Sequence, residues 1–397
     1  MALVMSIRGI PRSVPAWLQA GLVAILSLAM FMMLQAHIAQ LNATQVEGIV
    51  GGDSLQYHQI ALGFHSDGFS MAYEKDLLHR QPLYPVLLWI GMAFGLDTPL
   101  ELLQVNVFLM VVSVFSIYFF SLWVFKNFWL AIFVCVCWVM WPLPREVAAT
   151  RLLTEPLFCI LIMHAALAFI GILRGLRPLP LFLTFACLSS LSYQTRPNGL
   201  FIFASGFLVL SMYFLLNSKM SPAKLLGYCL AAGLTFTFFS APTLVAKYQH
   251  RGNPLDHGYL SNFLWAETYD EGKQIQVRIT FSDFVERNSI KSSVKRLLRG
   301  YLKVTWGTLV VFNRKFVGLV EAFVFLGLLG SLFVRSSSTR YFGAWAWLSM
   351  LMIAWSFKAN PVFRIANAQI MPLGLVLLAL NLERIFPRLE HKQSPKL

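Results

Sequence analysis

Titratable side chains gather in one polar stretch, residues 51–85, that directly follows the first long apolar run of the chain. The stretch carries carboxylates, imidazoles and an arginine: Asp53, His58, His65, Asp67, Glu74, Asp76, His79 and Arg80. Carboxylates and imidazoles can take a proton from a hydroxyl group, and the guanidinium of arginine can bind a phosphate through two parallel hydrogen bonds. Their concentration beside an apolar segment predicts chemistry at the surface of a membrane.

Asp53 is the candidate catalytic base of this stretch. It follows Gly51 and Gly52, where the backbone can bend sharply, and it precedes an amphipathic run that contains Tyr57 and His58. A partly buried carboxylate has the raised basicity that is needed to deprotonate a hydroxyl nucleophile. We expect Tyr57 and His58 to contact the substrate. The alternative for Asp53 is a purely structural role as the N-cap of the following helix.

Glu155 is the second candidate acid. It stands in the sequence RLLTEP, residues 151–156, at the start of an apolar run. It could serve in catalysis or as a ligand for an ion or an acceptor. The structural alternative has Thr154 as an N-cap and Glu155 in the first helical turn, where a negative charge is favourable. A local salt bridge with Arg145 or Arg151 is a further alternative.

Arginines next to proline or asparagine are candidate phosphate ligands. Arg80, Arg196 and Arg364 each stand in such a polar turn, and Arg145 and Arg151 share one short polar segment. The planar guanidinium suits bidentate binding of phosphate, so we include all five among the expected substrate-binding residues. The alternative for any one of them is an anchor at the headgroup boundary.

Motifs for nucleotides and metals are missing from the sequence. It has no P-loop, no G-x-G-x-x-G, no H-E-x-x-H and no Asp-x-Asp pair. We therefore assign no metal ligands and no definite cofactor, and leave a divalent cation as a possibility. The net charge of +14 does not come with a patch that would read DNA or RNA, so no nucleic-acid partner is expected.

The elements that must position these residues are membrane helices. Hydrophobic residues make up 57% of the chain and charged residues 13%, which is too apolar for a soluble domain. Helices are expected because the bilayer offers no partner to free backbone amides. The apolar runs predict an all-α polytopic membrane protein with about ten spans, near residues 16–36, 102–125, 128–142, 155–173, 179–193, 199–217, 225–246, 316–334, 341–357 and 368–386.

The topology follows from one short apolar segment and from the distribution of charge. Residues 82–95 are too short for a span and are expected to form an interfacial or re-entrant helix. With that choice, Lys and Arg favour the cytoplasmic side of the short connections, and both termini lie in the cytoplasm. The chain is then a single membrane domain, 1–397, with extracytoplasmic loops at 37–101 and 247–315. Within the second loop, residues 283–302 predict a basic amphipathic helix on the membrane surface, either resting on the headgroups or acting as a lid over an anionic lipid.

The order of five short motifs resembles a known superfamily. After the first span come Gly-Asp-Ser-x-x-Tyr-His at 52–58 and Arg-x-Pro-Leu-Tyr-Pro at 80–85, followed by Thr-Glu-Pro at 154–156, Thr-Arg-Pro at 195–197 and a late Arg364. This pattern is similar to that of the GT-C integral-membrane glycosyltransferases, in particular the group around protein O-mannosyltransferases and lipid A aminoarabinose transferases. Many relatives carry two acids in the first motif, whereas here the neighbour of Asp53 is a serine.

The resemblance implies an activity and a set of partners. The donor would be a sugar on a polyprenyl phosphate, and the acceptor a glycan, lipid or protein on the extracytoplasmic face of the membrane. Asp53 would act as the base of an inverting transfer, Glu155 would match the second acid of the family, and Arg80 would bind the lipid phosphate. We expect the inner (plasma) membrane of a bacterium.

Two other functions remain open on the sequence alone. One is a lipid-linked glycan flippase or transporter, although the spans are nearly free of charge apart from His164 and Glu321. The other is a glycan polymerase or ligase of the O-antigen type, which uses a diphosphate-linked donor.

Overall fold

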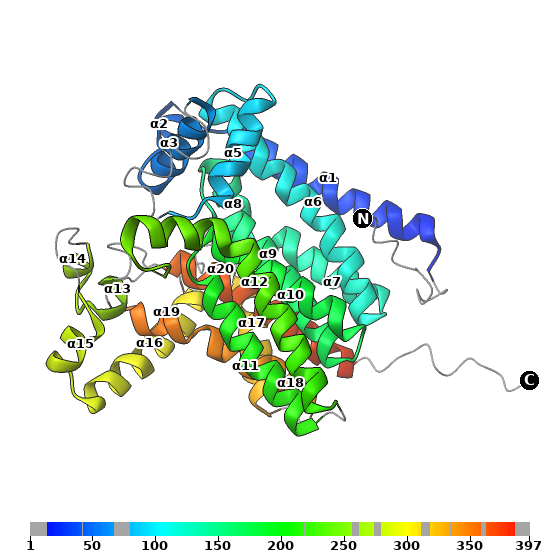
Figure 1. Ribbon diagram of the computed structural model, residues 1–397. Coiled ribbons are helices and arrows are strands. Elements are labelled where there is room, and N and C mark those ends of the chain that lie inside the picture. The colour runs from blue at the N-terminus through cyan, green and yellow to red at the C-terminus, as the bar shows by residue number, and fades with distance from the viewer. Residues whose placement is uncertain are drawn as a thin grey trace, which may run out of the picture.

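Nineteen helices account for the secondary structure of the described part of the chain, which contains no strand (Figure 1). The computed structural model describes residues 14–41, 43–66, 80–217, 220–255, 262–273, 279–310, 318–333, 336–358 and 363–385. The helices are α1 (Ala16–Ala39), α2 (Ala43–Gly48), α3 (Asp53–Ser66), α5 (Leu83–Ala93), α6 (Pro99–Phe125), α7 (Phe128–Met140), α8 (Pro142–Thr150), α9 (Glu155–Leu173), α10 (Pro178–Thr195), α11 (Gly199–Asn217), α12 (Pro222–Arg251), α13 (Asn262–Trp265), α14 (Tyr269–Gly272), α15 (Phe281–Arg287), α16 (Ile290–Val310), α17 (Gly318–Phe333), α18 (Ser337–Ser349), α19 (Leu351–Ser356) and α20 (Phe363–Ile385). The predicted all-α class is confirmed.

Six helices are individually long and apolar enough to cross a bilayer: α1, α6, α9, α11, α12 and α20. Two bent pairs raise the possible number of spans in the described residues to eight. The first pair, α7 with α8, bends by 46°, and the second, α17 with α18 and α19, bends by 119°. The chain is therefore a multi-pass helical membrane protein.

The expected number of about ten spans is two higher, for two reasons. Segments 316–334 and 341–357 were expected to cross separately, but the structure folds them into one bent pair. Segment 179–193 lies in α10, which is not among the candidate spans because its last residues, SSLSYQT at 189–195, are mostly polar. α10 packs between α9 and α12, where its hydroxyl and amide groups find partners in the protein.

The short apolar segment after the first polar stretch forms α5. Its eleven residues extend only about 16 Å, roughly half of the hydrocarbon thickness. It packs against α3 and α6 rather than crossing the membrane by itself. The connection ends at Thr98, which caps α6 in a reciprocal capping box with Glu101.

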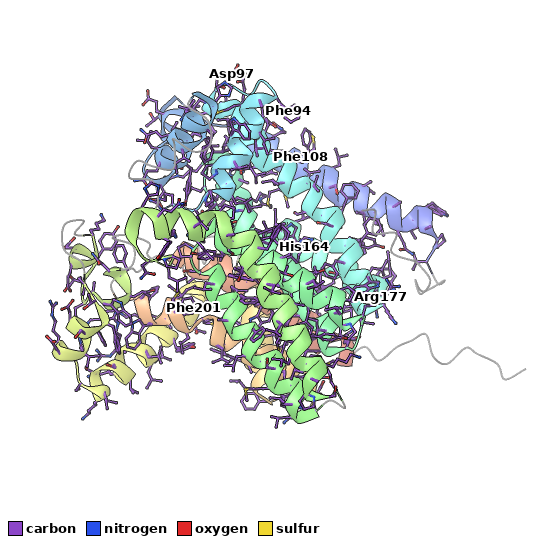
Figure 2. All side chains as sticks on the ribbon, in the orientation of Figure 1. Phe94, Asp97, Phe108, His164, Arg177 and Phe201 are labelled. Atoms are coloured by element: carbon purple, nitrogen blue, oxygen red, sulfur yellow. The ribbon has the colours of Figure 1, made fainter. Side chains whose placement is uncertain are left out.

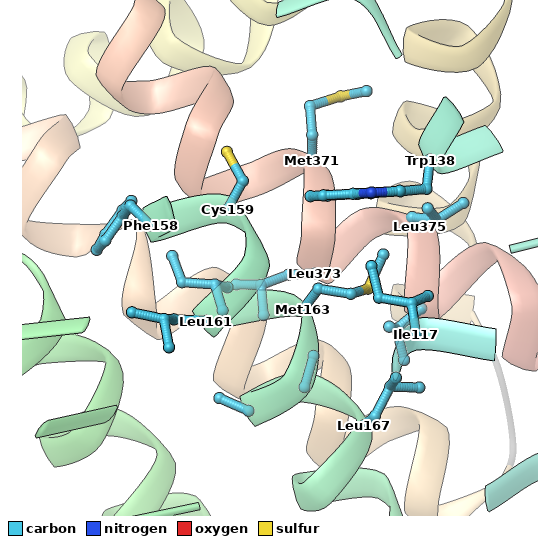
Figure 3. Close-up of a cluster of buried hydrophobic side chains, with 14 of the residues drawn as sticks. Ile117, Trp138, Phe158, Cys159, Leu161, Met163, Leu167, Met371, Leu373 and Leu375 are labelled. Atoms are coloured by element: carbon cyan, nitrogen blue, oxygen red, sulfur yellow. The ribbon is translucent and has the colours of Figure 1, made fainter. Parts of the chain in front are cut away.

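The core of the bundle is centred on α9 and α20. In their apolar windows 89% and 83% of the residues are buried, against 22% in α1 and α12, which therefore lie at the periphery. Figure 3 shows Cys159, Met163 and Leu167 of α9 beside Met371 and Leu375 of α20. The first residues of α9 are consequently packed inside the bundle.

Asp97 and Arg177 mark two separated ends of the molecule in Figure 2. Asp97 lies two residues before the start of α6, and Arg177 directly precedes α10. The polar stretch around α3 lies at the Asp97 end. α3 packs on α5, and Gly91 of α5 lies against Leu102 and Val105 near the start of α6.

The predicted amphipathic helix at 283–302 is wrong as a single element. The structure divides it into α15 and α16 at Asn288 and Ser289. The Asn288 amide donates to the carbonyl of Phe284 at the end of α15, and the Ser289 hydroxyl accepts from the amide of Ser292 at the start of α16. Both residue types compete with helical hydrogen bonds through their side chains, which explains the break.

Candidate functional site

Asp53 forms an ion pair with Arg80 at the start of α3. Gly52 has a φ of +60°, a left-handed conformation that lets the chain turn from α2 into α3. The carboxylate Oδ1 of Asp53 then lies 2.6 Å from Nη2 of Arg80, and Nε of Arg80 donates to Oε1 of Gln56 at 2.5 Å. The Asp53 side chain is 46% exposed and that of Arg80 only 11%. The carboxylate is therefore accessible from solvent, while the guanidinium is largely buried and held by Gln56.

Two tyrosine rings pack beneath the arginine of this pair. The guanidinium of Arg80 lies over the ring of Tyr57, 5.4 Å from its centroid. Tyr57 in turn meets Tyr84 of α5 edge to face, with ring centroids 5.7 Å apart. Both rings are buried, so they hold the Arg80 guanidinium against the bundle.

Glu155 forms a second ion pair, with Arg196. Its Oε1 lies 2.6 Å from Nη2 of Arg196, and Nε of Arg196 donates to the Thr154 hydroxyl at 2.7 Å. The Glu155 side chain is fully buried and that of Arg196 is 10% exposed. Thr154 stands at the N-cap position of α9 and Glu155 in its first turn, as the structural alternative predicted, but the Thr154 side chain makes no cap hydrogen bond. The expected local salt bridge is wrong, because the partner of Glu155 comes from the end of α10.

The two ion pairs belong to one electrostatic cluster. Burial by itself lowers the pKa of Arg196, but the neighbouring Glu155, Tyr57 and Asp53 raise it by more, and the pKa is raised overall. Burial raises the pKa of the Tyr84 hydroxyl most, the hydrogen bond to Asn106 lowers it by less, and the charges of Glu155 and Tyr57 add smaller increases. The groups that were expected to act together are therefore neighbours in space.

Asn106 connects the two pairs mechanically. The amide oxygen of this buried residue accepts from the Tyr84 hydroxyl at 2.9 Å. Its amide nitrogen donates to the carbonyls of Ala148 at 3.3 Å and Arg151 at 3.2 Å. One side chain of α6 thus connects Tyr84 of α5 to the end of α8, which leads to Glu155 at the start of α9.

No known protein family, curated protein or solved structure matches this chain. Assignment to a family therefore stays a prediction from the order of the motifs. The geometry of the two ion pairs is independent of that assignment.

Three further candidate residues take no part in either ion pair, and a fourth has no described side chain. His58 is half-buried on α3, and burial lowers its pKa. Arg145 points from α8 towards α1, where its Nη1 contacts the sulfur of Met33 at 3.1 Å. Arg151 has an exposed side chain at the end of α8 and contributes its carbonyl to Asn106. The side chain of Arg364 lies outside the described residues.

Some acids and histidines of the first polar stretch also cannot be placed. Residues 67–79, which include Asp67, Glu74, Asp76 and His79, lie outside the described residues, and so does the side chain of Glu321. Within the described ranges, no group of three His, Cys, Asp or Glu side chains could hold a metal ion.

Three buried polar residues of this region were not singled out in the sequence. Tyr84 is part of the Arg-x-Pro-Leu-Tyr-Pro motif, and Asn106 is a lone amide near the start of an apolar run. Lys247 is completely buried near the end of α12, with Nζ 5.6 Å from the centroid of the Tyr193 ring. A polar side chain inside an apolar run was the available signal for Asn106, since such groups need a partner in the protein.

Proposed function

We propose that the chain is a membrane glycosyltransferase that moves a sugar from a polyprenyl-phosphate donor to an acceptor hydroxyl on the extracytoplasmic face. One observation carries the proposal. Two carboxylates and two arginines from distant segments meet as Asp53–Arg80 and Glu155–Arg196 at the same end of a helical membrane bundle. Fixed cations beside a reachable carboxylate are what transfer from a phosphate leaving group requires.

Asp53 is the base in this mechanism. Its carboxylate takes the proton of the acceptor hydroxyl while the hydroxyl oxygen bonds to the anomeric carbon of the sugar. The bond from that carbon to the phosphate oxygen breaks, and polyprenyl phosphate leaves with the electron pair. Attack from the face opposite the phosphate inverts the anomeric centre. The exposed side chain of Asp53 suits this role better than the buried Glu155.

Arg80 is the proposed phosphate ligand, and the ion pair gives it a second function. Asp53 neutralises Arg80 in the ion pair. A donor phosphate that binds the guanidinium competes with the carboxylate for it, and the released carboxylate becomes the stronger base. Donor binding therefore prepares the base in the same step that neutralises the leaving group.

Glu155 and Arg196 are proposed to position the site. A buried carboxylate in the first turn of the most buried helix holds Arg196 in one orientation. Arg196 then presents a fixed positive charge to the cluster that contains Tyr57 and Asp53. The extracytoplasmic orientation in this proposal rests on the charge distribution of the sequence.

The test is transfer from radiolabelled polyprenyl-phosphate sugars to lipid, glycan or protein acceptors in membranes that lack the protein. We expect label transfer with the purified chain, and loss of transfer in Asp53→Asn. Asp97→Asn is the matched control, because Asp97 is an exposed acid at the same end of the bundle. Transfer by Asp53→Asn at the rate of the unmodified chain would refute the base.

The same assay separates the alternatives. Transfer only from diphosphate-linked glycans would identify a polymerase or ligase. Movement of intact lipid-linked sugar across a vesicle, with no transfer to any acceptor, would identify a flippase and would overturn the enzymatic proposal.

A further inference from the structure

One face of α16 is fixed against the rest of the protein. Nε of Arg296, which is only 6% exposed, donates to the carbonyl of Trp355 at 2.9 Å. One turn later Gly300 packs so closely on α19 that a Cβ at this position would lie 1.8 Å from the carbonyl oxygen of Ala354. The next residue, Tyr301, donates its hydroxyl to the carbonyl of Trp347 at 2.8 Å. The rotation of α16 about its axis is therefore determined.

The rest of its circumference carries two chemically different columns. The first column is apolar and strongly exposed: Ile290 at 85%, Val294 at 51%, Leu298 at 58% and Leu302 at 72%. The second column consists of the basic residue that follows each of them, all four exposed: Lys291, Lys295, Arg299 and Lys303. Residues four apart share a helix face, and neighbours in sequence lie about 100° apart around the axis.

The basic column has no acidic partners among the residues that the structure describes. The nearby carboxylates pair elsewhere, since Glu267 binds Arg296 and Lys358, and Glu271 binds Arg287. Within the same described ranges the apolar column is also left uncovered, as its exposure shows. If α16 lay in water, its apolar column would stay exposed to solvent, which is unfavourable. If it lay in the hydrocarbon core, its four charged side chains would lose their hydration.

We propose that α16 lies in the membrane–water interface and binds anionic phospholipid headgroups. The apolar column enters the boundary of the acyl chains, the basic column meets lipid phosphates, and the third face holds the helix to α19. Only the boundary layer of a bilayer satisfies both columns at once. Positive charges at that depth select anionic lipids, because each Lys or Arg near such a surface gains electrostatic free energy. This surface is separate from the proposed transfer site and does not depend on it.

The first experiment measures the depth of Leu298 in the full-length protein in nanodiscs. Leu298→Cys carries an environment-sensitive fluorophore in a background with Cys187→Ala and Cys229→Ala, since these two cysteines are not fully buried. Matched labels replace exposed Glu286 on α15 and exposed Leu234 on the candidate span α12. We expect the Leu298 label to be quenched by lipids brominated near the headgroup, the Leu234 label by lipids brominated deep in the chains, and the Glu286 label by aqueous iodide.

The second experiment measures the local enrichment of anionic lipid. A small fraction of brominated phosphatidylglycerol or of brominated phosphatidylcholine is added to otherwise identical discs, and the quenching of the Leu298 label is compared. We expect stronger quenching by the anionic lipid, a preference that falls with salt. Replacement of all four basic residues by Gln should remove it, with roughly fivefold lost per charge at low salt. A variant with each Lys changed to Arg and Arg299→Lys should retain it.

Three results would overturn the proposal. One is a Leu298 label that iodide quenches as strongly as it quenches the Glu286 label. Another is equal quenching by the two lipids in the unmodified helix. The third is protection of Leu298 from both quenchers, which would mean that a second copy or another protein covers the face.

Discussion

The two acid–arginine pairs have the same chemistry but opposite environments. Asp53 and Arg80 meet at the rim of the bundle, where the carboxylate is 46% exposed. Glu155 and Arg196 meet inside it, where the carboxylate is fully buried and the arginine also binds Thr154. An exposed pair can exchange partners with a ligand at little cost, whereas separating a buried pair leaves a charge without solvent. The outer pair is suited to turnover and the inner pair to positioning.

Glu155→Ala should show the largest effect on stability. Removing one member of a buried ion pair typically costs about 3–5 kcal/mol, because Arg196 keeps its charge in a buried site. The check is the midpoint of thermal unfolding in detergent, followed by tryptophan fluorescence. The double variant Glu155→Leu with Arg196→Met is the control and should recover most of the loss. Equal destabilisation by the single and double variants would show that packing, not charge, governs this site.

Asp53→Asn should affect activity and hardly affect stability. The exposed ion pair contributes roughly 0–1 kcal/mol to folding, so the unfolding midpoint should stay almost unchanged. Loss of a general base should slow transfer by about 10²–10⁴-fold. The measurement is the transfer rate at saturating donor beside the unfolding midpoint. A midpoint shift as large as that of Glu155→Ala would remove the distinction between the two pairs.

Lysine in place of arginine should separate the two pairs more finely. Arg80→Lys keeps the charge but loses the bidentate fork, so polyprenyl phosphate should bind roughly tenfold more weakly with little change in stability. Arg196→Lys cannot bond both Glu155 and Thr154 from the same position and should lower the unfolding midpoint instead. Binding of sugar-free polyprenyl phosphate, measured by tryptophan quenching, and thermal unfolding provide the two readouts. The reverse assignment of effects would exchange the roles of the two arginines.

Asn106→Ala should loosen the connection between the pairs. It leaves the carbonyls of Ala148 and Arg151 and the Tyr84 hydroxyl without their partner, at a cost of about 1–3 kcal/mol. Tyr84→Phe removes only one of these bonds and should cost about 1 kcal/mol. Thermal unfolding measures both, and similar values for the two variants would argue against Asn106 as the connecting residue.

The smallest effect is a pH dependence of the outer region through His58. Burial lowers its pKa below the unfolded value of 6.5, so the unfolded chain binds the proton more readily than the folded chain. The stability contribution is therefore complete above pH 6.5 and decreases as the pH falls from there towards the folded pKa. Thermal unfolding at a series of pH values measures this, and His58→Gln should flatten this part of the stability profile.

The motifs predicted the members of the site better than their pairing. Asp53 begins a helix after a left-handed glycine, as the Gly-Gly-Asp sequence indicated. The four expected arginines whose side chains are described, in contrast, divide into different environments. Arg80 and Arg196 join the cluster, while Arg145 turns towards α1 and Arg151 stays exposed. Spacing along the chain cannot distinguish these cases, because each arginine stands in a similar polar turn.

The sequence by itself determined the class of the protein and the segments that carry its polar residues. Its apolar runs require a helical membrane bundle, since free backbone amides have no partner in lipid, and its polar stretches identify the ends of that bundle. The tertiary structure decided that Glu155 pairs with Arg196 and not with its neighbours, and that Asn106 joins the two pairs. It also decided that α10 packs between α9 and α12 and that α16 turns an apolar and a basic column outwards. These outcomes depend on which helices pack together, and packing partners are set by contacts between residues far apart in the chain.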